Sequence, residues 1–173
     1  GTGGSFSYNY NSSNPAWYKQ QTLTFEEQWK AGIRAFEIVS DRPSSSTETL
    51  GTQDVKCNKE SMGVTVLEVL NNLLSKVSTP REGKTEPSEC AVLILTYQPE
   101  GVSGNARNAA SYASSLKLMY DNLDASQKNQ IIQYTPELTL EQAKGNVMIF
   151  CRINQKDEAD AADVTIDGVK LNA

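Results

Sequence analysis

The stretch that most constrains the fold of this chain is residues 28–42, which reads QWKAGIRAFEIVSDR. Trp29 and Ile33 lie four residues apart, so they share one face of a helix. Gly32 is the residue type that takes the left-handed conformation with which many helices end. The apolar residues that follow, at 35–39, predict a strand that is covered on both faces. A helix that is followed directly by a buried strand is typical of a layered α/β fold.

One carboxylate interrupts this apolar strand. Glu37 is costly to bury unless it is paired, hydrogen-bonded or bound to a metal. Asp41 and Arg42 follow at the strand exit, and parallel α/β proteins place their chemistry at the carboxyl ends of their strands. Two interpretations therefore stay open. Glu37 is either part of a functional site or a structural carboxylate that pairs with an arginine, for which Arg34, Arg42 and Arg152 are candidates.

Helical and strand patterns alternate along the rest of the chain. Helices are expected at 25–31, 64–77 and 105–123, with one turn opened by 139–142, strands at 35–39, 54–57, 90–97, 131–134 and 147–153, a loop at 59–62, and a hairpin at 164–171. This alternation predicts an α/β fold with a parallel sheet and helical crossovers. The 173 residues are fewer than the roughly 250 of a closed eight-stranded α/β barrel. We therefore expect a partial barrel or an open sheet, in one domain at 1–155 with an acidic linker and hairpin at 156–173.

The composition removes several function classes. The chain has no histidine, which takes away the commonest general acid/base and the commonest transition-metal ligand together. Its 16 basic and 21 acidic residues give a net charge of −5 without a basic stripe, which argues against a nucleic-acid partner. No apolar run is long enough to form a transmembrane segment.

The three cysteines are too few for a disulfide framework and show no metal-ligand spacing, and one bridge plus a free thiol stays compatible with the sequence. Cys90 and Cys151 lie beside apolar strand runs and are expected to be buried structural thiols. Cys57 is a nucleophile by residue type, but no histidine is present to activate it, so a structural or disulfide-bridging role is favoured.

Several blocks of the sequence resemble the X domain of phosphatidylinositol-specific phospholipase C and related phosphodiesterases. The matching blocks are GTGGSFSY at 1–8, QWKAGIRAFEIV at 28–39, VTVLEVLNNLL at 64–74, AVLILTY at 91–97 and LTLEQAKGNVMIFCR at 138–152. The resemblance covers most of residues 1–153, and the block at 28–39 is its most specific part. It implies a distorted α/β barrel, of which this chain holds a part, and phosphoric diester hydrolase activity on phospholipids or glycerophosphodiesters.

The chain departs from the family where the chemistry is done. The family implies two histidines, one acting as general base and one as general acid. The first position falls at Gly3, with Gly4 in place of the neighbouring aspartate, and the second falls near Cys57. Only Glu37 keeps a strand carboxylate, and the charged family position two residues later is Val39. General acid–base catalysis contributes roughly 100- to 10,000-fold per group, so we expect little of this activity to remain.

The site expected from these residues lies at the strand exits. The ligand-binding candidates are Gly3, Gly4, Glu37, Lys56, Cys57 and Tyr97, and the catalytic candidates of a rebuilt site are Glu37, Asp41 and Arg152. For Lys56 the alternative is a solvated charged loop, and for Tyr97 and Arg152 it is capping of strand ends. No metal or other cofactor is expected, since a calcium site needs several oxygen ligands.

Three functions are compatible with these sequence features. The preferred one is a phospholipase C-like domain, inactive as an enzyme, that binds a ligand or has a structural role. The second is an active phosphodiesterase with a rebuilt site. The third is an unrelated α/β domain, in which the strands that begin at residues 35 and 91 would not be neighbours. The expected partners are an inositol phospholipid, a phosphodiester or a sugar, with peripheral membrane contact, in a secreted, cell-surface or periplasmic bacterial protein.

Overall fold

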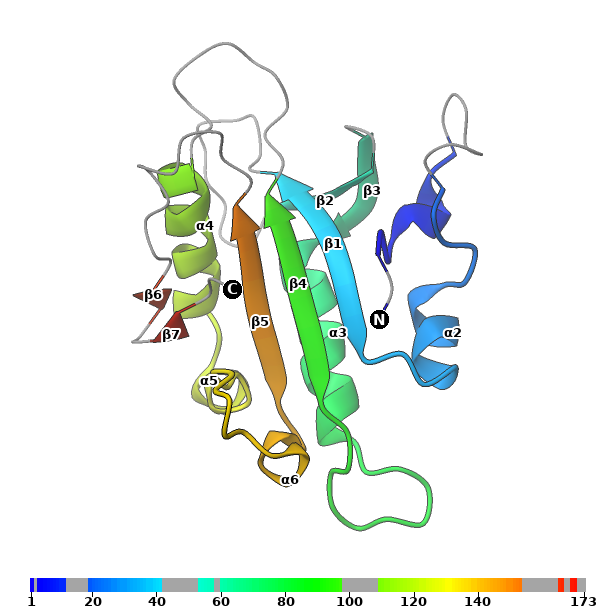
Figure 1. Ribbon diagram of the computed structural model, residues 1–173. Helices are drawn as coiled ribbons and strands as arrows, with labels where there is room; N and C mark the ends of the chain where they lie inside the picture. Colours follow the sequence, from blue (N-terminus) through cyan, green and yellow to red (C-terminus); the bar gives the residue numbers. More distant parts are fainter. Residues whose placement is uncertain are drawn as a thin grey trace.

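A computed structural model describes residues 1, 3–11, 19–41, 53–57, 60–97, 109–153, 165–166 and 169–170 (Figure 1). The helical elements are η1 (Ser7–Asn9), α2 (Phe25–Lys30), α3 (Val66–Ser78), α4 (Ala109–Asp121), α5 (Ala125–Asn129) and α6 (Leu140–Ala143). The strands are β1 (Ala35–Asp41), β2 (Asp54–Cys57), β3 (Glu60–Thr65), β4 (Ala91–Tyr97), β5 (Val147–Ile153), β6 (Thr165–Ile166) and β7 (Val169–Lys170). Among these described helices, none is long and apolar enough to cross a membrane.

The centre of the molecule is a five-stranded sheet in the order β3-β2-β1-β4-β5. β1, β4 and β5 run parallel, with Ala35 opposite Val92 and Val92 opposite Met148. This confirms the predicted α/β fold with parallel strands joined by helices, and it forms part of a barrel. Because β1 and β4 are direct neighbours, the unrelated-domain prediction for these two strands is wrong.

The loop predicted at residues 59–62 is wrong, because the chain forms β3 from Glu60 to Thr65 and pairs it antiparallel with β2. The segment ESMGVT buries only Met62, so it lacks the apolar alternation that marks a half-buried strand. The pairing is also irregular, since the register shifts between Asp54 and Lys56.

The helix predicted from residue 64 begins two residues later, and a capping box sets its start. The Thr65 hydroxyl accepts a hydrogen bond from the Glu68 amide, and the Glu68 carboxylate accepts one from the Thr65 amide at 2.7 Å. These two bonds satisfy amide groups that the first turn of a helix leaves without partners. Helix α4 lies within the range predicted for it, 105–123, of which residues 105–108 lie outside the described residues.

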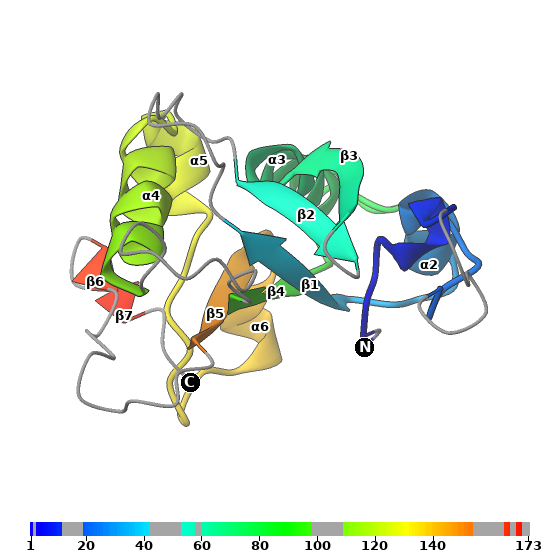
Figure 2. The same cartoon turned by 90° about the horizontal axis from the view of Figure 1, so that it is seen from above.

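One face of the sheet carries the core. Figure 2 shows α3 and α4 on the same side of the sheet. Fully or almost fully buried residues of this core include, from the strands, Phe36, Ile38, Leu93, Leu95 and Val147 and, from α3, Val66, Val69, Leu70, Leu73 and Val77. These buried residues of α3 recur at helical spacing, as in an amphipathic helix that packs one face against a core.

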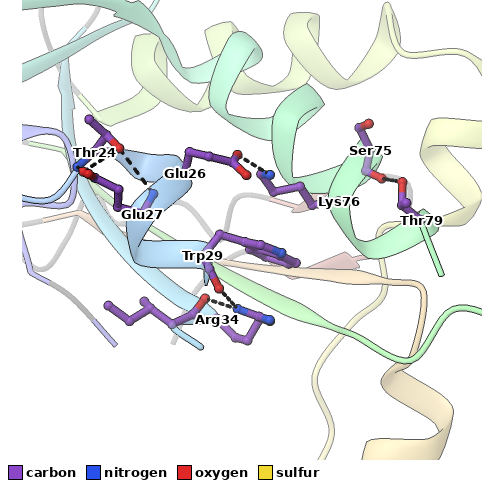
Figure 3. A network of polar contacts seen from close by, with 9 residues as sticks. Thr24, Glu26, Glu27, Trp29, Arg34, Ser75, Lys76 and Thr79 are labelled. Atoms are coloured by element: carbon purple, nitrogen blue, oxygen red, sulfur yellow. Dashed lines mark hydrogen bonds and ion pairs between the residues drawn. The ribbon is translucent and has the colours of Figure 1, made fainter. Parts of the chain in front are cut away.

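A polar network holds α2 against α3 at the opposite end of the sheet from the strand exits (Figure 3). Glu26 pairs with Lys76 of α3 at 2.5 Å. The guanidinium of Arg34 lies 3.8 Å from the centre of the Trp29 ring and donates to Glu89 at 2.8 Å. This hydrogen bond holds the pKa of Glu89 below its ordinary value. The predicted helix end at Gly32 is confirmed by its φ of +89°.

Two further segments differ from expectation. The strand predicted at 131–134 is reduced to one bridge, between Ile131 and Val147. The short helix α5 was not predicted, although Asp124 and Gln127 form a capping box at its start. The predicted one-turn helix is α6, capped by Thr139, and β6 pairs antiparallel with β7.

Candidate functional site

The two faces of the sheet receive alternate residues. We call the face that α3 and α4 leave uncovered the inner face, and its central row is Glu37 of β1, Ile94 of β4 and Phe150 of β5. All three side chains are half-buried, whereas their neighbours Phe36 and Leu93, which point to the opposite face, are completely buried.

Three polar residues meet on the inner face, and we call them the inner-face cluster: Glu37, Thr96 and Arg152. Oε1 of Glu37 accepts a hydrogen bond from the Thr96 hydroxyl at 3.2 Å and lies 3.1 Å from Nη1 of Arg152. The side chains of Glu37 and Arg152 are 33% and 56% exposed, so solvent reaches both charges. The structure thus pairs Glu37 with one of the three arginines proposed from the sequence.

The other two arginines do not take this role in the described residues. Arg34 donates to Glu89 and to the carbonyl oxygens of Trp29 and Ile33, and Arg42 lies outside the described residues.

The N-terminal segment borders the cluster. The Ser5 amide donates to the Glu37 carbonyl oxygen at 2.9 Å, which holds this segment alongside β1. A Cβ atom at Gly3 would lie 3.5 Å from Oε2 of Glu37 and 4.0 Å from Oε1 of Gln20. Oε2 of Glu37 makes no hydrogen bond to any residue that the structure describes, so it is an available acceptor near Gly3.

Gly4 gives the backbone of this segment a left-handed conformation. Its φ is +56°, and a Cβ atom there would overlap the side chain of Gln20. Only glycine adopts this conformation at no steric cost. Gly3 therefore lies beside the Glu37 carboxylate, whereas Gly4 borders the side chain of Gln20.

Tyr97 does not join the inner-face cluster. Its side chain points to the helix-covered face, where it is 1% exposed and stacks on Tyr112 with ring centres 4.4 Å apart. The alternative weighed for Tyr97 was the capping of a strand end, and what the structure shows is packing of its ring against α4. Thr96, one residue earlier, takes the place on the inner face.

Lys56 and Asp41 are placed through their backbones alone. The Cα atom of Lys56 lies opposite that of Val39, and the Cα atom of Asp41 lies opposite that of Asp54. Asp41 ends β1, and Lys56, in β2, lies beside the carboxyl-terminal part of β1, beyond Glu37. The side chains of Lys56 and Asp41 lie outside the described residues.

Cys57 is half-buried and packs against the core. Burial, and to a lesser degree the neighbouring Glu60 carboxylate, raises its pKa. A raised pKa lowers the thiolate fraction at neutral pH and so opposes a nucleophilic role. Cys90 and Cys151 are also free thiols; Cys151 is buried and Cys90 is half-buried. Among the described residues, no group of three or more acidic or cysteine side chains could hold a metal ion.

Sequence reasoning missed Thr96 and Gln20. Thr96 lies in an apolar strand. Ile94 is opposite Glu37, and Thr96, two residues later, points to the same face of the sheet as Ile94, which brings it beside Glu37. Gln20 belongs to a polar segment with no periodic signal, and its position depends on two hydrogen bonds from the 20–21 backbone to the Ser7 hydroxyl, each 2.9 Å long.

An apolar groove of about 380 Å³ adjoins the cluster on the inner face. Its floor is formed by residues of β4 and β5, among them Ile94 and Phe150, and its wall by the segment from Tyr134 to α6. Arg152 lines this groove and also contacts Glu37, so the polar cluster and the apolar groove are continuous.

The fold is shared with a known enzyme. No protein-family model and no curated protein matches this chain. Three solved structures of mutant or fluorinated forms of phosphatidylinositol-specific phospholipase C from Staphylococcus aureus match it at 19%, 17% and 18% identity, each with a TM-score of 0.64. Each match covers 88% of this chain and 46% of the enzyme chain, so this chain spans less than half of that protein. At these identities the likeness shows the fold, a phospholipase C-like barrel present in part.

Proposed function

With a partial phospholipase C-like barrel as the premise, we propose that this chain binds a phosphorylated polyol, such as the headgroup of an inositol phospholipid, on its inner face. The ligand contacts are Arg152 for the phosphate and Oε2 of Glu37 for a hydroxyl group. In this proposal the chain does not cleave phosphodiesters through a pair of imidazoles, because its 173 residues contain no histidine.

The observation that supports this proposal most is the meeting of Glu37, Thr96 and Arg152. The Thr96 hydroxyl and the Arg152 guanidinium both contact Oε1 of Glu37, whereas Oε2 lies on the side of Gly3 and accepts no hydrogen bond from a described residue. Nε and Nη2 of Arg152 make no hydrogen bond to a described residue. A guanidinium is well suited to bind a phosphate through two parallel hydrogen bonds, and a carboxylate accepts hydrogen bonds from hydroxyl groups.

The geometry of the inner-face cluster also argues against phosphodiester cleavage by general acid–base catalysis. Cleavage by general acid–base catalysis needs one group that takes a proton and another that gives one. Glu37 is the carboxylate of the inner-face cluster, and its Oε1 forms an ion pair with Arg152. Arginine stays protonated in proteins and does not act as an acid at neutral pH.

A turnover assay tests the loss of cleavage. Purified protein is incubated with phosphatidylinositol vesicles and, separately, with glycerophosphodiesters, and the water-soluble phosphate products are measured. We expect no product above that of a heat-denatured sample. Sustained cleavage by material free of contaminating enzyme would contradict the proposal.

The contact between Glu37 and Arg152 also favours a second candidate, an active phosphodiesterase with a rebuilt site. In that case the acidic and basic groups would be drawn from Glu37, Asp41, Lys56 and Arg152, the first and last of which touch at 3.1 Å. This candidate requires a measurable activity that Glu37→Gln abolishes. Unchanged turnover in Glu37→Gln would reject it.

The cellular setting belongs to the same proposal. A protein that binds the headgroup of an inositol phospholipid contacts the membrane surface peripherally. We propose a secreted or surface-attached bacterial protein, in keeping with the bacterial source of the structurally similar enzyme.

A further inference from the structure

A second cavity lies between α2 and α3, at the opposite end of the sheet from the strand exits. Its volume is about 320 Å³, and the residues that line it include Trp29 of α2, Ser75 and Lys76 of α3, and Pro80, Arg81 and Glu89 of the segment that leads to β4. We call it the α2–α3 cavity. Because two helices and a connecting segment form its walls, it is separate from the inner face and from the groove there.

The charged groups of the α2–α3 cavity are arranged in ion pairs. Lys76 pairs with Glu26, and Nε of Arg81 pairs with Oε1 of Glu89. Oε2 of Glu89 accepts the hydrogen bond from Arg34. Three cations thus face two carboxylates, a local excess of one positive charge in a chain whose net charge is −5. This excess suits a ligand that carries one negative charge.

The unused hydrogen-bonding groups at the cavity are mostly donors. Nη1 and Nη2 of Arg81 donate to no described residue, and this side chain is 60% exposed. Lys76 uses one of its three N–H groups in its ion pair. The Ser75 hydroxyl and the indole N–H of Trp29 also have no partner among the residues that the structure describes. Glu89, in contrast, has both carboxylate oxygens engaged.

Glu89 sets how Arg81 meets a ligand. The Glu89 side chain is 12% exposed, and Arg34 holds it from the other oxygen at 2.8 Å. Because Nε of Arg81 is engaged, the edge formed by Nη1 and Nη2 stays available, and this edge can bind a carboxylate through two parallel hydrogen bonds. A nearly buried carboxylate therefore orients a guanidinium that is itself exposed.

We propose that the α2–α3 cavity binds a small organic carboxylate, with its charged group on Arg81 and Lys76 and its apolar part against Pro80. A monocarboxylate fits better than a phosphate dianion, because the local excess is one positive charge and Glu26 and Glu89 repel a second negative charge. This inference is independent of the ligand proposed for the inner-face cluster.

The Trp29 ring contributes its edge to this site and not its faces. The Arg34 guanidinium lies 3.8 Å from the ring centre and the Lys76 ammonium 5.6 Å from it. Figure 3 shows Lys76 above the ring and Arg34 below it. A ligand that must stack on an open aromatic face, such as a sugar ring, is therefore not the occupant that this cavity favours.

The test is a titration of the intact chain followed by nitrogen–proton correlation NMR, which detects weak binding. Sodium butyrate is added to about 50 mM at constant ionic strength, and butyramide, its uncharged amide analogue, and inorganic phosphate are titrated in parallel. We expect the backbone amides of residues 75–81 and the indole N–H of Trp29 to shift and saturate, with a dissociation constant of about 1 mM for butyrate. Phosphate should bind at least about tenfold more weakly, and butyramide should cause no saturable shift.

Variants of one exposed residue locate the site. Arg81→Gln should weaken butyrate binding at least about tenfold, because the charged, two-pronged contact is lost, and Arg81→Lys, which keeps the charge alone, should fall between Arg81→Gln and the wild type. Lys84→Gln is the matched control, since Lys84 is an exposed cation of the same segment that does not line the cavity. Its affinity should stay within about twofold of the wild type. Circular dichroism shows whether each variant is folded.

Absence of saturable shifts with butyrate in the wild type would overturn the proposal. Equal weakening by Arg81→Gln and Lys84→Gln would do so as well, because it would indicate general charge attraction instead of a site. Tighter binding of phosphate than of butyrate would refute the carboxylate assignment. The wild-type titrations decide the question even if Arg81→Gln fails to fold, and none of these results bears on the inner-face cluster, which Arg152→Met tests.

Discussion

On one face of the central sheet, Leu93 and Leu95 are completely buried beneath helices, whereas Ile94, between them in the same strand, is half-buried on the inner face. Among the described residues, the strand side chains on the helix-covered face are apolar apart from hydrogen-bonded groups such as Ser40. The inner face combines an apolar groove with the charged pair of Glu37 and Arg152. The strands of one sheet thus build a core with one set of alternate residues and a candidate binding surface with the other.

This difference explains why Glu37 is tolerated. A carboxylate on the helix-covered face would be sealed from water and costly. On the inner face, the Glu37 side chain keeps 33% of its exposure and has two polar neighbours. Substitutions on each face can measure how sharply the two differ.

The largest expected effect is on stability, from truncations of adjacent residues in β4. Leu95→Ala removes a fully buried side chain and should lower the free energy of unfolding by about 3 kcal/mol. Ile94→Ala, on the half-buried inner face, should cost about 1 kcal/mol. Urea denaturation measures both. Equal losses would mean that the inner face is as tightly packed as the core.

A smaller loss of stability is expected when the polar contact that is buried between β1 and α4 is removed. The hydroxyls of Ser40 and Tyr112 hydrogen-bond to each other, and both side chains are 0% exposed. Tyr112→Phe keeps the ring that stacks on Tyr97 but leaves the Ser40 hydroxyl without this partner, at a cost of about 1–2 kcal/mol. Thermal unfolding of Tyr112→Phe and of the double variant with Ser40→Ala measures this cost. The double variant should recover part of the lost stability, because it no longer buries the Ser40 hydroxyl. If Tyr112→Phe is as stable as the wild type, this contact has no role in stability.

The sequence was most informative where apolar spacing and capping residues act locally. The helix end at Gly32, the strand that follows it and the helix after Thr65 depend on neighbours within a few residues. It failed at β3, because the segment ESMGVT gains its strand conformation from pairing with β2 rather than from its own pattern.

The candidate site was predictable only in part, for the same reason. Glu37 stood out as a charge in an apolar run, and Arg152 was one of its suggested partners. Thr96 and Tyr97 are adjacent at the end of β4, and the register with β1 alone decides that Thr96, not Tyr97, faces Glu37. The apolar run of β4 was expected to be buried on both faces, yet Val92 and Ile94 are half-buried, because the described residues cover the inner face only in part.

The thiols provide a test of burial that depends on pH. Burial raises the pKa of Cys151, on the helix-covered face, from 9.0 to about 12. Because the folded-state pKa is the higher one, the stabilisation is complete below pH 9 and is lost as the pH rises toward 12. The free energy of unfolding should fall by about 1 kcal/mol between pH 8 and pH 10, and Cys151→Ala should reduce that fall. A thiol reagent at pH 8 should label Cys151 only after denaturation; rapid labelling of the native protein would contradict its burial.

The smallest expected effect on stability is that of the charged pair on the inner face. Arg152 is 56% exposed, and exposed ion pairs contribute little. Arg152→Met should change the free energy of unfolding by no more than about 0.5 kcal/mol in urea denaturation. A loss of several kcal/mol would identify the pair as a structural element and remove the main reason for assigning it to ligand binding.

The most direct test of the inner-face cluster as a binding site is calorimetric titration of the folded protein with inositol 1-phosphate. We predict saturable binding to the wild type that Arg152→Met and Glu37→Gln each weaken at least about tenfold, since charged hydrogen bonds are lost. Lys117→Met, which removes an exposed cation on α4, should leave the affinity unchanged. Absence of binding to the wild type, or equal affinity in Arg152→Met, would contradict the assignment of this cluster to a phosphorylated ligand.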